Sequence, residues 1–199
     1  MTGVILSGGK NRRMGENKAF LAINGERLID RTVRLFRSIF KEVIIVTTDP
    51  TDYLDQPAVI VTDILPDKGA LGGIYTGLFF AREQHVFVSA CDMPFLSLPL
   101  LRYMVSLAAG CDVVVPAVGD WLEPLHAIYG KACLGPIERM LEAGERKIVR
   151  FFPEVRVRVV QEAEIDRLDP QRLSFLNVNT PEDWDTIRAI SSTSSSFPR

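Results

Sequence analysis

The sequence lacks long hydrophobic runs, an excess of basic charge and an even set of cysteines. No apolar stretch approaches the roughly 20 residues that cross a bilayer, and residues 3–7 have a strand pattern rather than that of a charged-then-apolar leader. We therefore expect a cytoplasmic protein with no membrane partner. Lys and Arg number 23 against 25 Asp and Glu, a formal net charge of -2, so no overall basic field is available to bind nucleic acid.

Cysteine and histidine are both scarce. Cys91, Cys111 and Cys133 are widely spaced in apolar surroundings, which is typical of reduced core thiols rather than of disulfides or a zinc site. The only histidines are His85 and His126, and neither is placed to suggest a Cys/His nucleophilic pair. We interpret His126 as a core histidine rather than a catalytic one.

What remains is an ordinary globular composition. The 199 residues are 47% hydrophobic and 24% charged, enough for one well-buried core. We expect a single domain over residues 1–190. The final "SSTSSSFPR", residues 191–199, is a low-complexity stretch that we predict to be a disordered tail.

Short runs rich in Val and Ile alternate with helical patterns. Because these runs are apolar on both faces, they belong in a sheet that is covered on both sides. The sequence therefore predicts an α/β fold with three layers, α/β/α, around a mostly parallel twisted sheet with an antiparallel strand. The predicted strands are 3–7, 42–48, 58–62, 85–90 and 111–116, and the predicted helices between them are 27–40, 71–83 and 97–109.

The pattern is less regular after Pro116, and no element is predicted over 117–130. A helix is expected over 132–145. Arginines alternate with valines over 154–160, which indicates a half-exposed edge strand, with an antiparallel orientation as one option.

The stretch "FLNVNTPEDW", residues 175–184, predicts a short strand followed by a helix. Thr180 is suited to the N-cap, Pro181 to the first helical position, and acidic residues follow in the first turn. We expect this last helix to reach about Ile190.

The clearest chemical signal is "SGGKNRRMGENK", residues 7–18, directly after the first predicted strand. Glycines there let backbone N–H groups approach an anion, and Lys10, Arg12, Arg13 and Lys18 offer charge to a polyphosphate. The pattern is neither a Walker loop nor G-x-G-x-x-G. The alternative is a solvated turn with incidental cations.

A second signal is "SACDMPF", residues 89–95, at the end of the fourth predicted strand. Asp92 is placed where a carboxylate holds the metal of a Mg-nucleotide. One carboxylate does not by itself make a metal site, yet Mg²⁺ commonly keeps waters and takes substrate phosphates as its remaining ligands. The alternative is a cap or turn residue.

Residues 63–78 contain several glycines, which lie around the start of the helix predicted over 71–83. They suggest close backbone approach to a flat ligand, and so the rim of a base-binding site, or else tight helix–sheet packing. We favour packing for Gly77, which lies inside the helix. The glycines are Gly69, Gly72, Gly73 and Gly77.

Two further polar groups follow later in the chain. Asn177 and Asn179 flank Val178 and should face the same side, where their amides position a polar substrate or complete a metal shell. The alternative is capping of the next helix, for which Thr180 is better suited. Arg146 and Lys147 follow a predicted helix C-terminus, where cations complement the helix dipole.

Together these stretches resemble the molybdenum cofactor guanylyltransferase family, in the nucleotidyltransferase branch of the Rossmann-like GT-A fold. The resemblance covers nearly the whole chain except the serine-rich tail. The matching stretches are "LSGGKNRRMGENKAFLAINGERLI", "DKGALGGIYTGL", "CDMPF", "EPLHAIY", "AGERKI" and "FLNVNTPED".

The resemblance implies transfer of GMP from GTP to the terminal phosphate of molybdopterin, with Mg²⁺ as cofactor and pyrophosphate as leaving group. It implies an N-terminal nucleotide-binding half, about 1–95, and an acceptor-binding half, about 96–190. Other cofactor-biosynthesis proteins and recipient molybdoenzymes are the candidate protein partners. Two alternatives stay open: another nucleotidyltransferase, using CTP or a sugar-phosphate acceptor, and a non-catalytic cofactor carrier.

The resemblance also assigns residues. Leu6, Ser7 and Gly8 would hold the nucleotide through their backbone. Lys18, Arg13 and Asp92 would be catalytic, with Asp92 also the Mg²⁺ ligand. The other positions implied for nucleotide, triphosphate or pterin are Gly9, Gly15, Asp63, Gly69, Gly73, Asn177 and Asn179.

The sequence departs from the family pattern at three places. Ser7 replaces the usual Ala, and Glu16-Asn17 replaces the Asp that commonly precedes the lysine. After the second strand the family often has an Asn for the nucleotide, where this chain has Val46-Thr47-Thr48.

Overall fold

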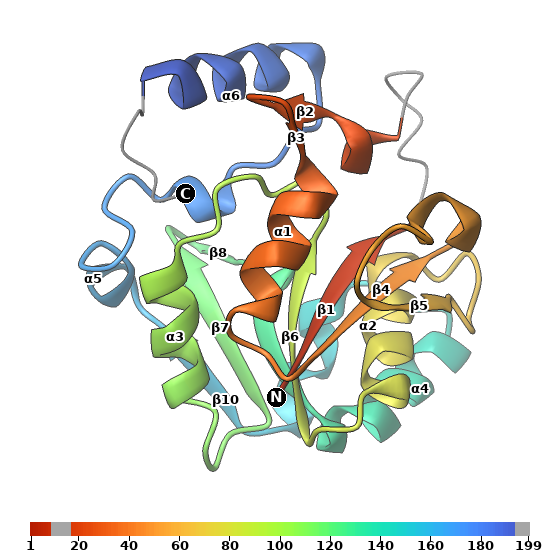
Figure 1. The fold of residues 1–199 in the computed structure, drawn as a ribbon. Coiled ribbons are helices and arrows are strands. Elements are labelled where there is room, and N and C mark those ends of the chain that lie inside the picture. Colours follow the sequence, from red (N-terminus) through yellow and green to blue (C-terminus); the bar gives the residue numbers. More distant parts are fainter. Residues whose placement is uncertain (9–16, 194–199) are drawn as a thin grey trace.

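A twisted sheet forms the centre of the molecule in the computed structural model, which describes residues 1–8 and 17–193 (Figure 1). Its strands run in the order β10-β7-β9-β6-β1-β4-β5, and β8 pairs with β7 off this path. The strands are β1 Thr2–Ser7, β4 Glu42–Thr47, β5 Val59–Thr62, β6 His85–Ala90, β7 Val113–Val118, β8 Trp121–Leu122, β9 His126–Gly130 and β10 Val157–Val160, and a separate small hairpin is formed by β2 Ala22–Ile23 and β3 Glu26–Arg27.

The sheet is mostly parallel, as the sequence predicts. β1 pairs in parallel with β4 and β6, and β4 pairs in parallel with β5. β9 is antiparallel to both of its neighbours, β6 and β7, and the two-residue strand β8 is antiparallel to β7. The sheet is continuous across the two predicted halves, 1–95 and 96–190, and the division at that point stays a prediction.

The later strands differ from the sequence analysis at two places. β9 lies where no element was predicted, because its sequence His126-Ala-Ile-Tyr-Gly has few β-branched residues although the strand is buried along its whole length. β10 is an edge strand, as expected, but it is parallel to β7. Its alternation of Arg and Val reflects the half-exposed edge position, which carries no information about strand direction.

Helices cover both faces of the sheet and complete three layers (Figure 1). Side chains of α2 and α4 pack in one hydrophobic cluster against one face of the sheet, and side chains of α1 and α3 pack in another that includes Ile5 and Ile45. The helices are α1 Leu28–Arg37, α2 Gly69–Phe80, α3 Leu98–Ser106, α4 Leu134–Glu142, α5 Glu162–Ile165 and α6 Pro181–Thr193. Short 3₁₀ turns are η2 Lys18–Phe20, η3 Pro50–Tyr53, η4 Lys131–Cys133, η5 Ile148–Glu154 and η6 Leu173–Phe175.

The C-terminal helix α6 lies beside the β2–β3 hairpin (Figure 1). Thr180 caps it as predicted, since its Oγ1 accepts from Asp183 N at 3.1 Å. The short strand predicted before it is absent: residues 176–179 are irregular and are held through Val178 N, which donates to Asp92 O at 3.0 Å. α6 includes residues 191–193, and the rest of the predicted tail, 194–199, lies outside the described residues.

The scarce residue types lie where the sequence suggests. Cys91, Cys111 and Cys133 form no disulfide, and burial raises the pKa of both Cys91 and Cys133 to about 12, so neither is a reactive thiolate. His126 is fully buried. None of the helices in the described ranges is both long and apolar enough to cross a membrane.

Candidate active site

A cavity of about 450 Å³ lies at the carboxyl ends of β1, β4 and β6. The chain passes from β1 outward to β4 and β5 and then returns to β6 on the other side of β1. This change of direction is where ligands bind in open α/β sheets. Its lining residues are Leu6, Gly8, Val46, Thr47, Thr48, Asp63, Asp67, Gly69, Ala70, Gly73, Ala90, Cys91, Asp92, Leu125, Arg146, Asn177 and Asn179.

Three distant segments meet in one polar junction beside this cavity. Lys18, at the start of η2, places its Nζ 3.6 Å from Asp92 Oδ2 and donates to Asn179 Oδ1 at 3.3 Å. Asp92 and Asn179 line the cavity, and Lys18 is only 5% exposed behind them. The junction therefore holds a cation next to a carboxylate and an amide at the cavity wall.

The electrostatics of Asp92 suit a cation ligand. Its side chain is 16% exposed, and burial raises its pKa, while the charge of Lys18 opposes that shift. Among the described residues no group of three or more His, Cys, Asp or Glu side chains gathers. The one carboxylate here is compatible with a hard cation such as Mg²⁺ that takes its remaining ligands from water and substrate phosphates.

Asp63 is the second carboxylate of the cavity and is held firmly from α2. Its Oδ1 accepts from Thr76 Oγ1 at 2.7 Å and from Leu65 N at 3.1 Å. Thr76 Oγ1 in turn accepts from Ile64 N at 3.2 Å. The buried Thr76 of α2 thus fixes the Asp63 carboxylate and also the backbone of the residue that follows it.

The glycines of α2 pack closely against the sheet. A Cβ at Gly77 would lie 2.6 Å from Val4 Cγ1, and one at Gly73 would lie 3.1 Å from Leu6 Cδ2. Packing therefore explains Gly77, as predicted. Gly73 also lines the cavity. The lack of a side chain there therefore both allows close packing against Leu6 and leaves space in the cavity. Gly69 begins the helix with a φ of +65°, a conformation that favours glycine.

Asn177 and Asn179 both line the cavity although the segment between them is not a strand. Val178 is fully buried between them in the cluster that contains Ile187. Asn179 N donates to Asp183 Oδ2 at 2.9 Å. Both asparagines therefore face the cavity, as the sequence predicts. Their orientation is set by the buried Val178 and by the hydrogen bond at the start of α6, and not by pairing within a sheet.

Of the predicted site residues, most of those that are described line one cavity. Lys18 lies one layer behind it, and the Ser7 side chain points elsewhere, to Tyr53 Oη at 2.5 Å. Gly9, Arg13 and Gly15 lie outside the described residues. The predicted residues that line the cavity are Leu6, Gly8, Asp63, Gly69, Gly73, Asp92, Asn177 and Asn179.

Other lining residues were not assigned a role from the sequence. Thr47 and Thr48 end β4 and begin the loop after it, and Arg146 follows the left-handed turn at Gly144 after α4. The threonines carry a topological signal, because a residue at the carboxyl end of a central parallel strand faces the ligand edge. The residues around Arg146 in the sequence do not show whether it lines a cavity or only complements the dipole of the preceding helix.

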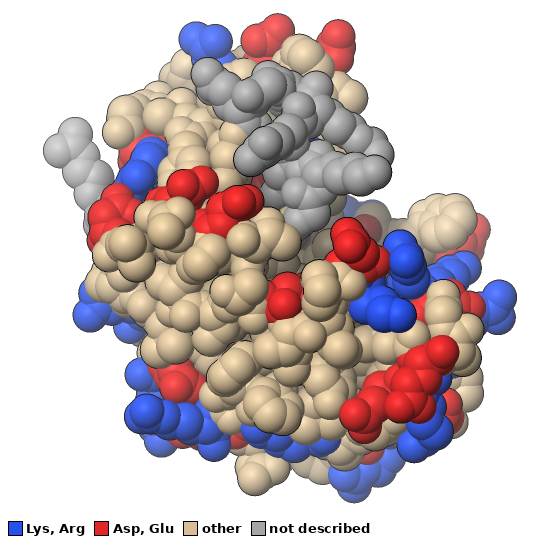
Figure 2. All heavy atoms as spheres, turned by 90° about the vertical axis from the view of Figure 1, so that its right-hand side faces the viewer, with Lys and Arg blue, Asp and Glu red and all other residues tan. Residues whose placement is uncertain are grey.

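Charge is mixed on the face that Figure 2 shows. Lys and Arg side chains there are interspersed with Asp and Glu around a largely uncharged centre, and they form no continuous basic surface. A small anionic ligand in a cavity agrees better with this distribution than a nucleic-acid polymer does.

Comparison with known proteins gives a consistent result. A molybdenum cofactor guanylyltransferase of Desulfosudis oleivorans is 39% identical over 191 residues, 95% of each chain, and a probable one of Pelotomaculum thermopropionicum is 40% identical over 97% of this chain and 94% of its own. The crystal structure of molybdopterin-guanine dinucleotide biosynthesis protein A from Archaeoglobus fulgidus matches with a TM-score of 0.83 at 28% identity, covering 97% of this chain and 100% of that one. Residues 3–160 match the MobA-like NTP transferase domain, and the chain therefore belongs to that family of nucleotidyltransferases.

Proposed function

We propose that this protein is a molybdenum cofactor guanylyltransferase, which transfers GMP from GTP to the terminal phosphate of molybdopterin. The observation that carries the proposal is the junction of Lys18, Asp92 and Asn179 beside a cavity of about 450 Å³. The near full-length relatives that bear this name support it.

The reaction needs little proton transfer. An oxygen of the acceptor phosphate forms a bond to the α-phosphorus of GTP, and the bond from that phosphorus to the α,β-bridging oxygen breaks. Pyrophosphate leaves with the electron pair. Because the nucleophile is already an anion, the protein must chiefly position two anions and offset their repulsion.

The described residues divide these tasks. Lys18 supplies positive charge beside the cavity, and Asn177 and Asn179 present neutral amides that orient polar groups without adding charge. Asp63 is fixed by Thr76 and is a candidate to accept hydrogen bonds from the nucleoside. We extend the proposal to backbone contacts from Leu6, Ser7 and Gly8.

Mg²⁺ is the proposed cofactor, and Asp92 is the residue that would hold it. The oxygen donors at this position fit a hard cation. When bound, Mg²⁺ would neutralise phosphate charge and hold phosphate oxygens in a fixed geometry. Arg13 and Gly9 are proposed for the same triphosphate from the sequence resemblance alone, and the acceptor-binding role of residues 96–190 is a proposal of the same kind.

The test is pyrophosphate release from GTP, and separately from CTP, with Mg²⁺ and purified metal-loaded molybdopterin as acceptor. We expect release with GTP only, dependent on both the acceptor and the metal. Release with CTP would instead indicate a cytidylyltransferase. Release with neither nucleotide would indicate a sugar-phosphate acceptor or a non-catalytic carrier, which direct GTP binding and a panel of sugar phosphates separate.

A further inference from the structure

One buried hydroxyl holds both ends of the segment between β1 and η2. Ser7, the last residue of β1, shares a hydrogen bond with Tyr53 Oη at 2.5 Å. Asn17, which directly precedes η2, donates from Nδ2 to the same oxygen at 3.0 Å. The end of β1 and the residue before η2 are therefore both hydrogen-bonded to one atom, the hydroxyl oxygen of Tyr53 in η3.

The Tyr53 ring is itself fixed. It is fully buried and packs against Phe20 with ring centroids 5.2 Å apart. The guanidinium of Arg27 lies 5.5 Å from the centre of the Phe20 ring. A tyrosine that is held on its ring face has little freedom to move its hydroxyl.

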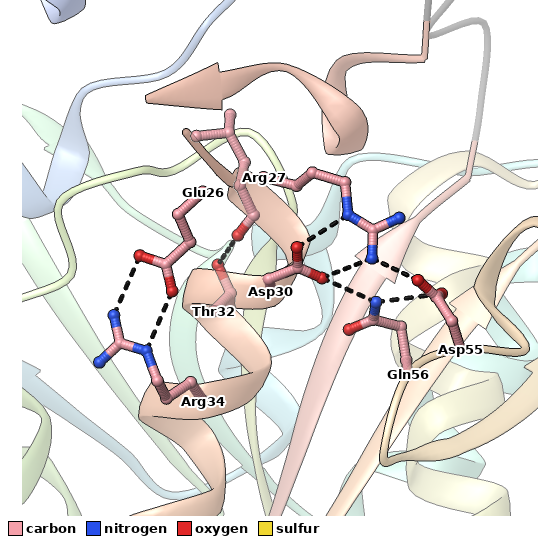
Figure 3. A network of polar contacts seen from close by, with 8 residues as sticks. Glu26, Arg27, Asp30, Thr32, Arg34, Asp55 and Gln56 are labelled. Atoms are coloured by element: carbon pink, nitrogen blue, oxygen red, sulfur yellow. Dashed lines mark hydrogen bonds and ion pairs between the residues drawn. The ribbon is translucent and has the colours of Figure 1, made fainter. Parts of the chain in front are cut away.

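A polar network anchors Asp55 and Gln56, which follow η3 in the chain, as Figure 3 shows. Arg27 pairs with Asp30 at 2.8 Å and also with Asp55, two residues after Tyr53. Gln56 Nε2 donates to Asp30 Oδ1 at 2.8 Å. The segment that carries Tyr53 is thus tied to β3 and α1 and not only to the residues that its hydroxyl contacts.

Both ends that Tyr53 holds adjoin the candidate site. Ser7 is followed by Gly8, which lines the cavity. Asn17 caps η2, because its Oδ1 accepts from Ala19 N at 3.1 Å, and this cap orients Lys18, the next residue. The hydroxyl therefore sets the position of Gly8 relative to Lys18.

We propose that Tyr53 is a positioning residue for the nucleotide site, in which one hydroxyl fixes Gly8 and Lys18 relative to each other through Ser7 and Asn17. The inference rests on the proposed function for the identity of the ligand, a nucleoside triphosphate. It assigns Tyr53 no contact with substrate. The Ser7 side chain takes part in it because this chain has a hydroxyl at that position.

The test compares Tyr53→Phe, Ser7→Ala and the double variant with a matched control, Tyr129→Phe. Tyr129 is equally buried, and its hydroxyl donates to Pro124 O at 2.6 Å, so the control also loses one buried hydrogen bond. Three quantities are measured for each: hydrogen exchange of the peptide covering residues 7–20, equilibrium binding of GTP, and KM against kcat for GTP. The melting temperature of each variant is recorded as well.

We expect Tyr53→Phe to raise exchange in that peptide and to weaken GTP binding by about ten-fold, because the variant loses the hydrogen bonds of the Tyr53 hydroxyl to Ser7 and to Asn17. KM should rise while kcat at saturating GTP changes by less than about three-fold, since the clamp acts on ground-state binding. Ser7→Ala should change the same quantities. The double variant should lose less GTP affinity than the sum of the two single losses, because both single variants remove the same hydrogen bond between Ser7 and Tyr53. Tyr129→Phe should leave all three unchanged.

The outcomes separate this inference from the proposed function. Unchanged exchange and unchanged GTP affinity in Tyr53→Phe would overturn the clamp. A loss of thermal stability equal to that of Tyr129→Phe, with no change in exchange or binding, would overturn it too by showing a purely structural role. If the wild-type protein did not bind GTP but Tyr53→Phe still raised exchange, the clamp would stand and the nucleotide assignment would fail.

Discussion

Lys18 Nζ lies 3.6 Å from Asp92 Oδ2, and the two side chains are only 7% and 16% exposed. Removing two charges from water costs free energy that their mutual attraction does not reliably return. The raised pKa of Asp92, caused by burial in spite of the neighbouring cation, agrees with that view. The pair is therefore not explained by the stability of the fold, and we attribute it to the proposed ligand site.

The first prediction concerns Asp92→Asn, which keeps the shape of the side chain but removes its charge. We expect GMP transfer to fall by at least about 100-fold, the scale on which fixed charges contribute to catalysis. The variant should still fold, since Lys18 retains Asn179 as a hydrogen-bond partner, but its melting temperature should fall because the Lys18 charge stays buried without a carboxylate. Turnover is therefore compared at a temperature where circular dichroism shows both proteins folded. The control is Asp166→Asn, which removes an exposed carboxylate paired with Arg172. Wild-type turnover in Asp92→Asn would sink the assigned role.

The second prediction concerns Thr76→Val, an isosteric change that removes the hydroxyl holding Asp63. We expect GTP binding to weaken by about five- to ten-fold, because the carboxylate loses the hydrogen bond that fixes its orientation. The control is Thr32→Val in α1, where an equally buried hydroxyl donates to Leu28 O at 3.0 Å. Both variants should lose stability in urea denaturation. Equal GTP affinities for the two variants would contradict the role of Thr76.

The fold was predictable because its signals are strong and local. The β1, β4 and β6 runs are apolar on both faces, and a chain with such runs separated by helical patterns has few options other than a covered parallel sheet. The position of Asp92 at the cavity was predictable from the topology, since a polar residue that closely follows a buried central strand lies at the ligand edge of the sheet.

The misses have a different physical origin. β9 was missed because a strand held between two others needs only to fit its neighbours, and the buried His126 and Gly130 do not look like strand formers. Long-range contacts escape local patterns as well. Nothing near Tyr53 in sequence predicts that it bonds to Ser7 and Asn17, and nothing near Arg146 predicts that it lines the cavity.

The third prediction compares two helix glycines with different amounts of space around them. A Cβ at Gly77 would lie 2.6 Å from Val4 Cγ1, whereas one at Gly135 in α4 would meet only Arg139 Nη1, at 3.5 Å. We expect Gly77→Ala to destabilise by about 1–3 kcal/mol through overpacking. Gly135→Ala should change the stability by less than about 1 kcal/mol, because its methyl group meets only the end of the Arg139 side chain and the position before Pro136 limits any gain in helix propensity. Urea denaturation measures both, and equal losses for the two would contradict the packing explanation.

The fourth prediction concerns His126, which is fully buried with neither ring nitrogen hydrogen-bonded within the part of the chain that the structure describes. Its ring instead lies edge-on to Phe87 and Phe175, with centroids 5.1 Å and 5.2 Å away. Burial lowers its pKa from 6.5 to about 3. The folded protein therefore keeps the imidazole neutral in a pH range where the unfolded chain binds a proton.

The sign of the effect follows from linkage. Between pH 6.5 and about 3 the unfolded state binds more protons at His126, so the free energy of unfolding falls as the pH is lowered, by at most ~1.4 kcal/mol per pH unit. In His126→Leu this contribution is absent. Urea denaturation at pH 7.5 and pH 5.0 should show the wild type losing ~2 kcal/mol more than the variant. His85→Gln, the control at the only other histidine, should follow the wild type. Parallel pH dependences for wild type and His126→Leu would show that the buried imidazole does not set acid stability.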